Sequence, residues 1–314
     1  MRRPGPEWLG ILALVITAVL WGTNHVAARA VHDIVPLPVL SFWRWFLALI
    51  ILVPLAVPSI SRDRLVIRRD LTGLLVAGVF GVGVFSVFLY LGAYHSLAME
   101  VGLLNATTPV WVVILAALLR RSRPTLRQAA GLTVATIGIA VVLTRGQPAA
   151  ILDFRPTVGN IWAVLAAMVF AGFSMAIPRY TRDLAALSFT AVTAGGATAL
   201  IFLPLYLAWL GTGGAAFTIE GADQFTGLAV LAYIALGPTL IANVLWTYGT
   251  AQIGATRAGA FLYLSPLTSS VLSIVILNED VYPFHGTSFL LILAGLALLT
   301  WPSRSRRQER DVQL

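Results

Sequence analysis

Long apolar stretches alternate with short polar connections along the whole chain. The hydrocarbon core of a bilayer is about 30 Å thick, so a helix that crosses it needs about 20 mostly apolar residues. Ten segments meet that requirement, near residues 8–28, 38–58, 70–92, 100–119, 126–144, 157–177, 188–209, 225–248, 256–277 and 285–301. The pattern therefore predicts an all-α membrane protein with ten transmembrane helices.

The arginines indicate how the predicted helices are oriented. All 21 basic residues are arginines. With a cytoplasmic N-terminus, seventeen of them fall in inner segments, three fall in outer segments (Arg29, Arg145 and Arg155), and Arg44 lies inside the second span. Basic residues collect on the cytoplasmic side of membrane proteins. The distribution places both termini in the cytoplasm and Glu100 in an outer connection, and it predicts a multi-pass protein of the bacterial inner membrane.

Composition narrows the class of protein further. Hydrophobic residues make up 58% of the chain and charged residues 11%, whereas a soluble domain needs more polar surface. The net charge of +8 does not indicate a nucleic-acid partner, because the arginines stand in short clusters between apolar runs rather than on one basic face. The chain has no cysteine, which excludes disulfides and thiolate metal sites. We expect no metal site and no cofactor.

The two halves of the chain resemble each other. An offset of 157 residues pairs Gly92 with Gly249, Ala98 with Ala255, Gly102 with Gly259, Pro109 with Pro266 and Gly138 with Gly295. An offset of 150 residues pairs Gly22 with Gly172, Asn24 with Ser174, Arg29 with Arg179 and Pro54 with Pro204. The repeats, residues 1–150 and 151–314, each hold five predicted spans, so the second must enter the membrane from the opposite side. Inverted repeats of this kind place a substrate site near the midplane, where the halves meet.

The repeat also bears on the first span, which has the basic start and apolar core of a cleavable signal peptide. Because this span has a counterpart in the sixth, we expect it to belong to the mature fold.

Several motifs resemble those of EamA-type proteins in the drug/metabolite transporter superfamily. Residues 21–28 (WGTNHVAA) resemble the opening motif, and residues 41–48 (SFWRWFLA) are similar to the arginine-bearing second helix. Residues 264–266 (LSP) and 277–280 (LNED) resemble the "lsP…lgE" signature, whereas residues 120–123 (RRSR) depart from the glycine-glutamate pair common in the first repeat. The resemblance implies a metabolite transporter, most similar to the YddG-type exporters of aromatic and other amino acids.

The first and third predicted helices carry candidate substrate-binding residues. Trp21, Asn24 and His25 share one helix face, and a polar face inside a membrane meets protein or a water-filled cavity. We assign Trp21 and His25 to the cavity wall, with hydrogen bonds between helices as the alternative for His25 and the favoured role for Asn24. Tyr90 and Tyr94, one turn apart, are assigned to the cavity as well, with an interfacial aromatic belt as the alternative.

The fourth and ninth spans each contain a proline. Pro109 and its counterpart Pro266 are expected to interrupt their helices and to serve gating, with a packing kink as the alternative. Asn105 and Trp111 flank the first proline, and a polar ligand would supply the partner that a buried indole N–H needs. The remaining substrate-binding candidates are Trp162, Trp246 and Tyr263, of which the two tryptophans could instead be interfacial anchors.

Charge inside the membrane indicates the class of substrate. Arg44 could bind a substrate carboxylate, but we favour a structural role in which it snorkels outward or pairs within the protein. A single arginine argues against a phosphate, and the expected absence of an intramembrane acid argues against a multivalent cation. A neutral or zwitterionic molecule remains, recognised by aromatic rings, hydroxyls and amides.

The predicted function is export of aromatic or other neutral amino acids by alternating access. Multidrug efflux of amphipathic cations is the alternative, and a membrane scaffold is a remote one. No catalytic motif points to an enzyme. We expect a monomer or weak homodimer in the lipid bilayer and transport driven by the substrate gradient, with proton coupling through His25 as the alternative.

Overall fold

The fold is described from a computed structural model, which places residues 7–33, 35–120, 126–147, 157–215, 224–278 and 280–300. Within these ranges every regular element is a helix and there is no strand. The first half contains α1 (Glu7–Ala30), α2 (Leu37–Gly78), the π-helical segment η1 (Val79–Val84), α3 (Phe85–His95), α4 (Ala98–Asn105), α5 (Thr108–Arg120) and α6 (Leu126–Leu143).

The second half has a similar succession of helices. It contains α7 (Val158–Tyr180), α8 (Ala186–Ala197), the π-helical segment η3 (Thr198–Phe202), α9 (Leu203–Gly211), α10 (Gln224–Ile234), the π-helical segment η4 (Ala235–Ile241), α11 (Ala242–Ile253), α12 (Ala255–Gly259), the 3-10 helix η5 (Ala260–Tyr263), α13 (Leu264–Leu277) and α14 (Pro283–Thr300).

Seven helices of the described chain are long and apolar enough to cross a membrane. One of them, Leu37–His95, covers the second and third predicted spans together. Two shorter apolar helices, Ala129–Val141 and Pro283–Gly295, fall in the fifth and tenth predicted spans. The all-α prediction agrees with the described part of the chain, whereas ten crossings and the cytoplasmic placement of both termini stay predictions.

The connection expected between residues 58 and 70 is itself helical. Residues 37–95 form one continuous helical run. A straight helix rises 1.5 Å per residue and would separate Arg44 from Tyr90 by about 69 Å. The guanidinium carbon of Arg44 instead lies 4.7 Å from the centre of the Tyr90 ring, so the run folds back on itself. Pro54 and Pro58 lie in this run, where each removes a backbone hydrogen bond and allows bending.

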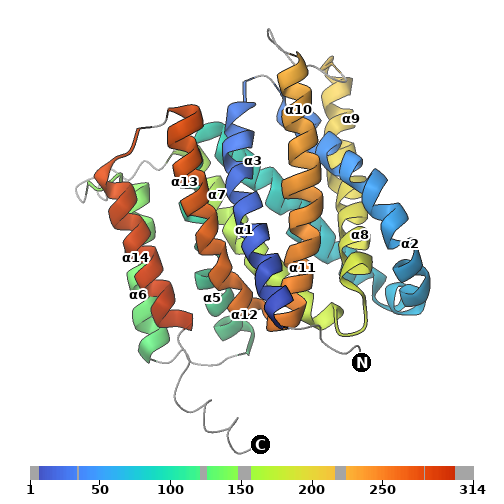
Figure 1. The fold of residues 1–314 in the computed structure, drawn as a ribbon, viewed down its shortest axis with the longest axis horizontal. Helices are drawn as coiled ribbons and strands as arrows, with labels where there is room; N and C mark the ends of the chain where they lie inside the picture. Colours follow the sequence, from blue (N-terminus) through green and yellow to red (C-terminus); the bar gives the residue numbers. More distant parts are fainter. Residues whose placement is uncertain are drawn as a thin grey trace, which may run out of the picture.

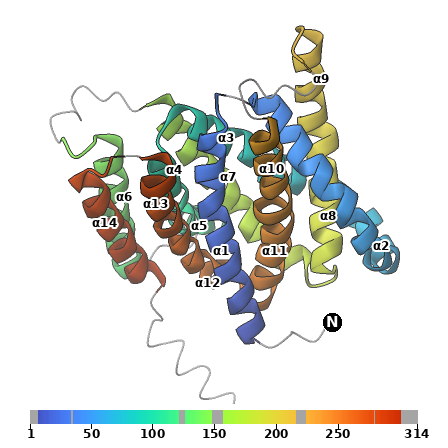
Figure 2. The ribbon, with the colours of Figure 1, turned by 45° about the horizontal axis from the view of Figure 1, so that its top comes forward.

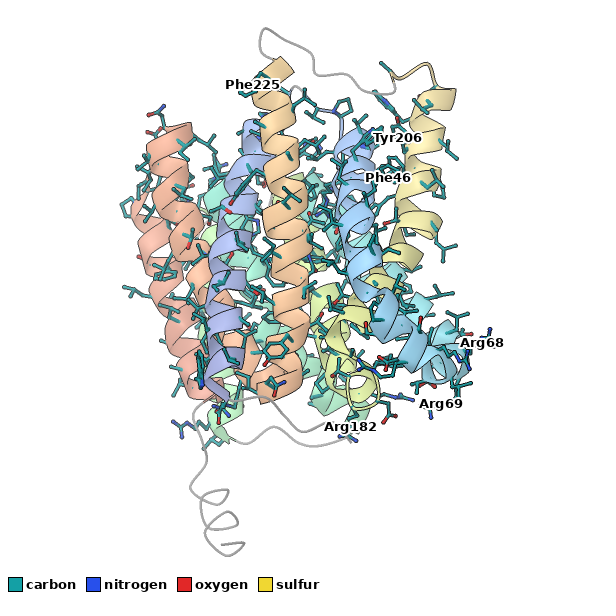
Figure 3. The ribbon with its side chains drawn as sticks, turned by 45° about the vertical axis from the view of Figure 1, so that its right-hand side comes forward. Phe46, Arg68, Arg69, Arg182, Tyr206 and Phe225 are labelled. Atoms are coloured by element: carbon teal, nitrogen blue, oxygen red, sulfur yellow. The ribbon has the colours of Figure 1, made fainter. Side chains whose placement is uncertain are left out.

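The helices form one bundle whose two ends carry different residues. Figure 1 shows α6 and α14 side by side at one edge, and α2, α8 and α9 at the other; Figure 2 shows the same order. Arg68, Arg69 and Arg182 gather at one end of the bundle, and the aromatic residues Phe46, Tyr206 and Phe225 lie toward the opposite end (Figure 3). This separation is typical of a protein with a basic cytoplasmic face and an aromatic interfacial belt.

Helix contacts in one half recur in the other. Helix α1 packs against α11 and α13, and its counterpart α7 packs against α3 and α5. A Cβ atom on Gly92 would lie 3.3 Å from the carbonyl oxygen of Gly159, where α3 meets α7. A Cβ atom on Gly249 would lie 2.9 Å from the carbonyl oxygen of Gly10, where α11 meets α1. Small residues therefore bring the backbones close at equivalent crossings.

The crossings of the two proline-bearing segments repeat the same relation. A Cβ atom on Gly102 would lie 3.5 Å from Cα of Pro266, and one on Gly259 would lie 3.1 Å from Cγ of Pro109. Both prolines follow irregular backbone: Pro109 comes after the break between α4 and α5, and Pro266 comes after η5. The 157-residue offset pairs the two glycines with each other and the two prolines with each other, so the two contacts are equivalent.

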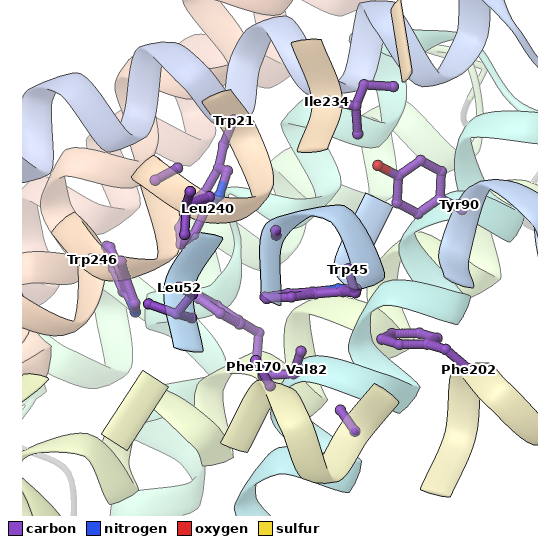
Figure 4. Packing of buried hydrophobic residues seen from close by; sticks show 14 of the residues in the cluster. Trp21, Trp45, Leu52, Val82, Tyr90, Phe170, Phe202, Ile234, Leu240 and Trp246 are labelled. Carbon is purple, nitrogen blue, oxygen red and sulfur yellow. The ribbon is translucent and has the colours of Figure 1, made fainter. Parts of the chain in front are cut away.

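The core between the halves is aromatic. Its largest fully buried side chains include Trp45, Tyr90, Phe170, Phe202 and Trp246, which come from both halves of the chain (Figure 4). The Trp21 ring centre lies 5.1 Å from that of Trp246 and 5.4 Å from that of Phe170, in tilted and edge-on arrangements that aromatic rings favour. These contacts fix α1 against α7 and α11.

The glycine crossings generate a prediction about packing. A Cβ atom on Gly22 would lie 2.5 Å from the carbonyl oxygen of Ser265 and 2.6 Å from Cβ of Thr268. We expect Gly22→Ala to lower the free energy of unfolding by about 1–3 kcal/mol, because overpacking displaces α1 from α13. Thermal unfolding of the detergent-solubilised protein measures this effect.

The counterpart glycine is the matched control. A Cβ atom on Gly172 would meet nothing within 4 Å, so Gly172→Ala should leave the melting temperature unchanged or raise it. Equal destabilisation by both substitutions would contradict this account of the α1–α13 crossing.

Candidate functional site

An internal cavity lies between the halves, which we call the central cavity. The cavity is narrow: its volume is ≈ 20 Å³, which is room for one or two water molecules. It is lined by Trp21, Asn24 and His25 of α1, Arg44 and Trp45 of α2, Gly81 and Val82 of η1, Phe85, Ser86 and Leu89 of α3, Asn105 of α4, Pro238 of η4 and Asn243 of α11. The lining combines apolar walls with a few polar groups, as in many small-molecule sites.

Helix α1 presents the predicted polar face to the cavity. The indole nitrogen of Trp21 donates to the carbonyl oxygen of Pro238 at 3.1 Å and ties α1 to η4. Asn24 accepts a hydrogen bond from the Tyr90 hydroxyl at 2.9 Å. His25 is 1% exposed, and neither ring nitrogen has a hydrogen-bond partner within the described structure. Asn24 therefore has a structural partner, whereas His25 has its full hydrogen-bonding capacity free.

Arg44 follows one of the two structural alternatives predicted for it, since it has partners within the protein. Its side chain does not snorkel outward: the residue is 5% exposed and lines the central cavity. One terminal nitrogen donates to Thr239 Oγ1 at 2.9 Å, and Nε has no partner. The guanidinium also lies 4.7 Å from the Tyr90 ring centre and 5.4 Å from that of Trp45. Cation–π contacts and one hydroxyl stabilise this charge, and no described carboxylate pairs with it.

Asn105 adds an acceptor to the cavity. Helix α4 ends at this residue, and two residues of turn separate it from α5. Its backbone carbonyl accepts from the Thr108 hydroxyl at 2.7 Å, while its side-chain oxygen is buried without a partner. The interruption ahead of Pro109 therefore exposes a polar group to the cavity, and the gating roles of Pro109 and Pro266 stay predictions.

Two tryptophan candidates and Tyr94 lie outside the lining. The Trp111 indole donates to the Thr107 hydroxyl one turn earlier, at 3.3 Å, so its partner is local. The Trp162 ring lies 4.9 Å from Phe88, and the Tyr94 hydroxyl donates to the Val35 carbonyl at 2.7 Å. Each of these three side chains thus contacts a neighbouring residue, and none of them needs a ligand as its partner.

Two further candidates support the cavity from behind. Tyr90 is fully buried and connects Asn24 to Arg44, and Trp246 packs behind Trp21. Tyr263 ends η5, and its side chain lies outside the described part of the structure. Tyr90 and Trp246 therefore fix the shape of the cavity lining without being part of it.

Sequence reasoning missed the contribution of η1. A π-helical turn contains an extra residue, which rotates the following side chains by about 100° relative to an α-helix. Gly81 and Val82 of η1 and Phe85 and Ser86 of α3 line the cavity as a result. Pro238 of η4 could have been found, since a proline within an apolar span signals irregular backbone.

Glu100 is also placed differently from the prediction. It lies in the first turn of α4, is 1% exposed, and neither carboxyl oxygen has a hydrogen-bond partner in the described structure. The Nε2 atom of buried His285 lies 3.9 Å from one of these oxygens. The prediction placed Glu100 in an outer connection, whereas the structure buries its carboxylate at the first residue of a helix that is long and apolar enough to cross a membrane.

Comparisons with known proteins identify the family. The sequence pattern of the EamA-like transporter family matches residues 8–144 and 157–301. The chain belongs to the EamA-like transporter family. This confirms the resemblance seen in the sequence motifs, and it makes the chain a membrane transporter.

Curated relatives of this EamA-like transporter cover nearly its whole length. It is 32% identical over 305 residues to a "Probable terminal-alkyne amino-acid exporter" of Streptantibioticus cattleyicolor, covering 95% of this chain and 96% of the relative. It is 26% identical to the "Uncharacterized inner membrane transporter YicL" of Salmonella typhimurium, covering 95% of this chain and 97% of that one. It is 25% identical to the "Uncharacterized transporter YetK" of Bacillus subtilis, covering 91% and 84%.

One solved structure shares the fold. The match has a TM-score of 0.65 at 19% sequence identity and covers 95% of this chain and 98% of that chain. At this identity the likeness supports the fold alone.

The hydrogen bond between Tyr90 and Asn24 generates a prediction. We expect Tyr90→Phe to lower the stability of the transporter by about 1–3 kcal/mol, because the buried Asn24 oxygen loses its donor. Thermal unfolding followed by tryptophan fluorescence measures the loss. Tyr282→Phe is the control, since Tyr282 is 46% exposed and outside the core. Equal shifts in melting temperature for the two variants would contradict a stabilising role of the buried hydrogen bond.

Proposed function

We propose that this EamA-like transporter exports zwitterionic amino acids and binds their carboxylate at Arg44 in the central cavity. The observation that carries the proposal is the buried guanidinium, which faces the cavity with its Nε free and without a carboxylate partner among the described residues. Charged groups inside a membrane protein are costly and are normally paired or exposed to a water-filled cavity. A substrate carboxylate would supply the missing counter-ion.

The other polar groups suit the second charge of a zwitterion. The free side-chain oxygen of Asn105 can accept from an ammonium group, and the Trp21 ring offers an aromatic face to a cation. A carboxylate at Arg44 and an ammonium group nearer Asn105 would leave the apolar part of the substrate against Val82, Phe85 and Leu89 of the lining. This arrangement supports aromatic or other neutral amino acids.

The same charge argues against the main alternative. An amphipathic cation would enter a cavity that already holds an unneutralised guanidinium, and like charges in a medium of low dielectric constant repel strongly. The name of the relative from Streptantibioticus cattleyicolor also supports an amino-acid substrate. Multidrug efflux is therefore the weaker candidate.

Alternating access between two inverted five-helix repeats completes the proposal. Two observations support two related halves. The Gly102–Pro266 contact has an equivalent in the Gly259–Pro109 contact, and the family pattern matches two segments of the chain. The arginine-rich end would face the cytoplasm of a bacterial cell. The substrate gradient would drive export, with proton coupling through the unpartnered His25 as the alternative.

Competition between an amino acid and its amide tests the substrate assignment. We expect a neutral amino acid to compete at least about 10-fold more strongly than its carboxamide in proteoliposome counterflow, because a charge-assisted hydrogen bond contributes about 1.5–3 kcal/mol. Equal competition by acid and amide would contradict carboxylate recognition, and saturation only by cationic dyes would support drug efflux instead.

Substitution of Arg44 separates a substrate role from a structural one. We expect Arg44→Gln to reduce amino-acid counterflow at least about 10-fold without lowering the melting temperature, since removal of an uncompensated buried charge does not cost stability. Arg182→Gln, at an exposed position, should leave both properties unchanged. A large loss of stability in Arg44→Gln would instead indicate the structural role.

A further inference from the structure

An apolar groove runs along the lateral surface of the bundle, between α7 and the segment formed by the end of α2 and η1. Its volume is ≈ 430 Å³, which is within the range of small-molecule sites. Its walls include Val76 and Phe80 on one side and Met168 and Gly172 on the other, and Tyr180 lies at one end. Val76 and Phe80 are 52% and 55% exposed, so the groove faces the lipid.

The groove is separated from the central cavity. Gly81 of η1 has no room for a Cβ atom, because the ring of Phe173 lies directly against it. Gly73 of α2 has no room for one either, because the hydroxyl end of Tyr180 lies against it. These contacts between α7 and α2–η1 form the floor of the groove. A ligand in the groove would therefore come from the bilayer and stay at the surface of the bundle.

The length of the groove matches one leaflet of a bilayer. Met168 and Tyr180 are the first and last residues of α7 in its lining, and the twelve residues from one to the other rise about 18 Å along the helix. Half of a hydrocarbon core of about 30 Å is about 15 Å. The groove therefore has the length and the apolar walls that suit one lipid acyl chain.

A positive charge lies at one end of the groove. Arg179 follows Gly172 by seven residues, or two helical turns, so both lie on the face of α7 that forms the groove. The two acids of this region, Asp70 and Asp183, both pair with Arg69. Arg179 is exposed and has no ion pair within the described chain. Its guanidinium is thus available to an anionic group at the membrane surface.

The equivalent surface of the other half is filled by the chain itself. The repeat offset pairs Gly172 with Gly22. A Cβ atom on Gly172 would meet nothing within 4 Å, whereas one on Gly22 would lie 2.6 Å from Cβ of Thr268. The counterparts of the two groove walls include Thr23 and Tyr233, whose hydroxyls are hydrogen-bonded to each other. The described chain therefore covers this surface in one half and leaves it open in the other.

We propose that the groove binds one acyl chain of an anionic phospholipid and that Arg179 binds the phosphate of its headgroup. The apolar walls bury the chain, and the guanidinium donates charge-assisted hydrogen bonds to the phosphate. With the arginine-rich end in the cytoplasm, this lipid belongs to the cytoplasmic leaflet, where anionic lipids attract basic residues. The site lies outside the central cavity and does not depend on the identity of the transported substrate.

Native mass spectrometry of the detergent-solubilised protein tests the headgroup contact, with phosphatidylglycerol and phosphatidylcholine as probes. We expect one phosphatidylglycerol to bind about 5-fold more tightly than phosphatidylcholine, the factor expected for one arginine beside an anionic headgroup. Arg179→Gln should remove this preference. Arg182→Gln is the matched control, because it removes the same charge at an exposed position beyond the end of α7 and should retain the preference.

A second variant tests the groove itself. Gly172→Leu places an apolar side chain in the groove, so it should weaken the binding of both lipids at least about 10-fold. Gly286→Leu is the control, at an exposed glycine of α14 whose added Cβ atom would also meet nothing within 4 Å, and should bind both lipids as the unmodified protein does. Melting temperatures in detergent establish that each variant is folded.

Three results would overturn the inference. The first is equal binding of the two lipids to the unmodified protein, and the second is undiminished lipid binding by Gly172→Leu. The third is a protein dimer that Gly172→Leu dissociates, with no bound lipid, which would assign the groove to a second copy of the chain.

Discussion

The guanidinium of Arg44 is held in the bundle interior by neutral groups from both halves of the chain. Thr239 of the second half accepts one hydrogen bond, and Tyr90 of the first half presents its ring face while donating to Asn24. These contacts orient the charge but leave it without a counter-ion among the described residues. The arrangement fixes the guanidinium in the wall of the central cavity, where a substrate carboxylate would meet it.

That constraint explains why the surrounding residues are large and aromatic. Trp45, Phe202 and Tyr90 bury the sides of the guanidinium, and Trp246 and Phe170 hold Trp21 in place behind the cavity. Because aromatic side chains lose little conformational freedom on burial, they keep the site rigid.

Sequence reasoning found the helices and part of the site. The face of Trp21 and His25 was predictable because helical spacing alone determines which side chains share a face. Trp111 and Tyr94 satisfied the same criteria, but hydrogen-bonding partners within α4–α5 and near Val35 take up their polar groups. Spacing does not say which partner a buried polar group finds, so these assignments needed tertiary structure.

The same limit applies to Arg44 and to the π-helical segments. A lone arginine in an apolar span has the same sequence pattern whether it turns outward or inward, and only the fold-back of residues 37–95 brings Tyr90 to it. The extra residue in η1 changes which face Phe85 and Ser86 present, which regular periodicity does not anticipate. Glu100 stands at the first residue of the predicted fourth span, and its position in the sequence does not show that tertiary packing buries its carboxylate.

The most direct measurement is an electron cryo-microscopy structure of the protein in nanodiscs with a saturating neutral amino acid. The account predicts density for the substrate in the central cavity, with its carboxylate within hydrogen-bonding distance of the Arg44 guanidinium and its ammonium group toward Asn105. Substrate density elsewhere, or an Arg44 side chain paired with a carboxylate of the protein itself, would contradict the claim that the substrate neutralises this charge.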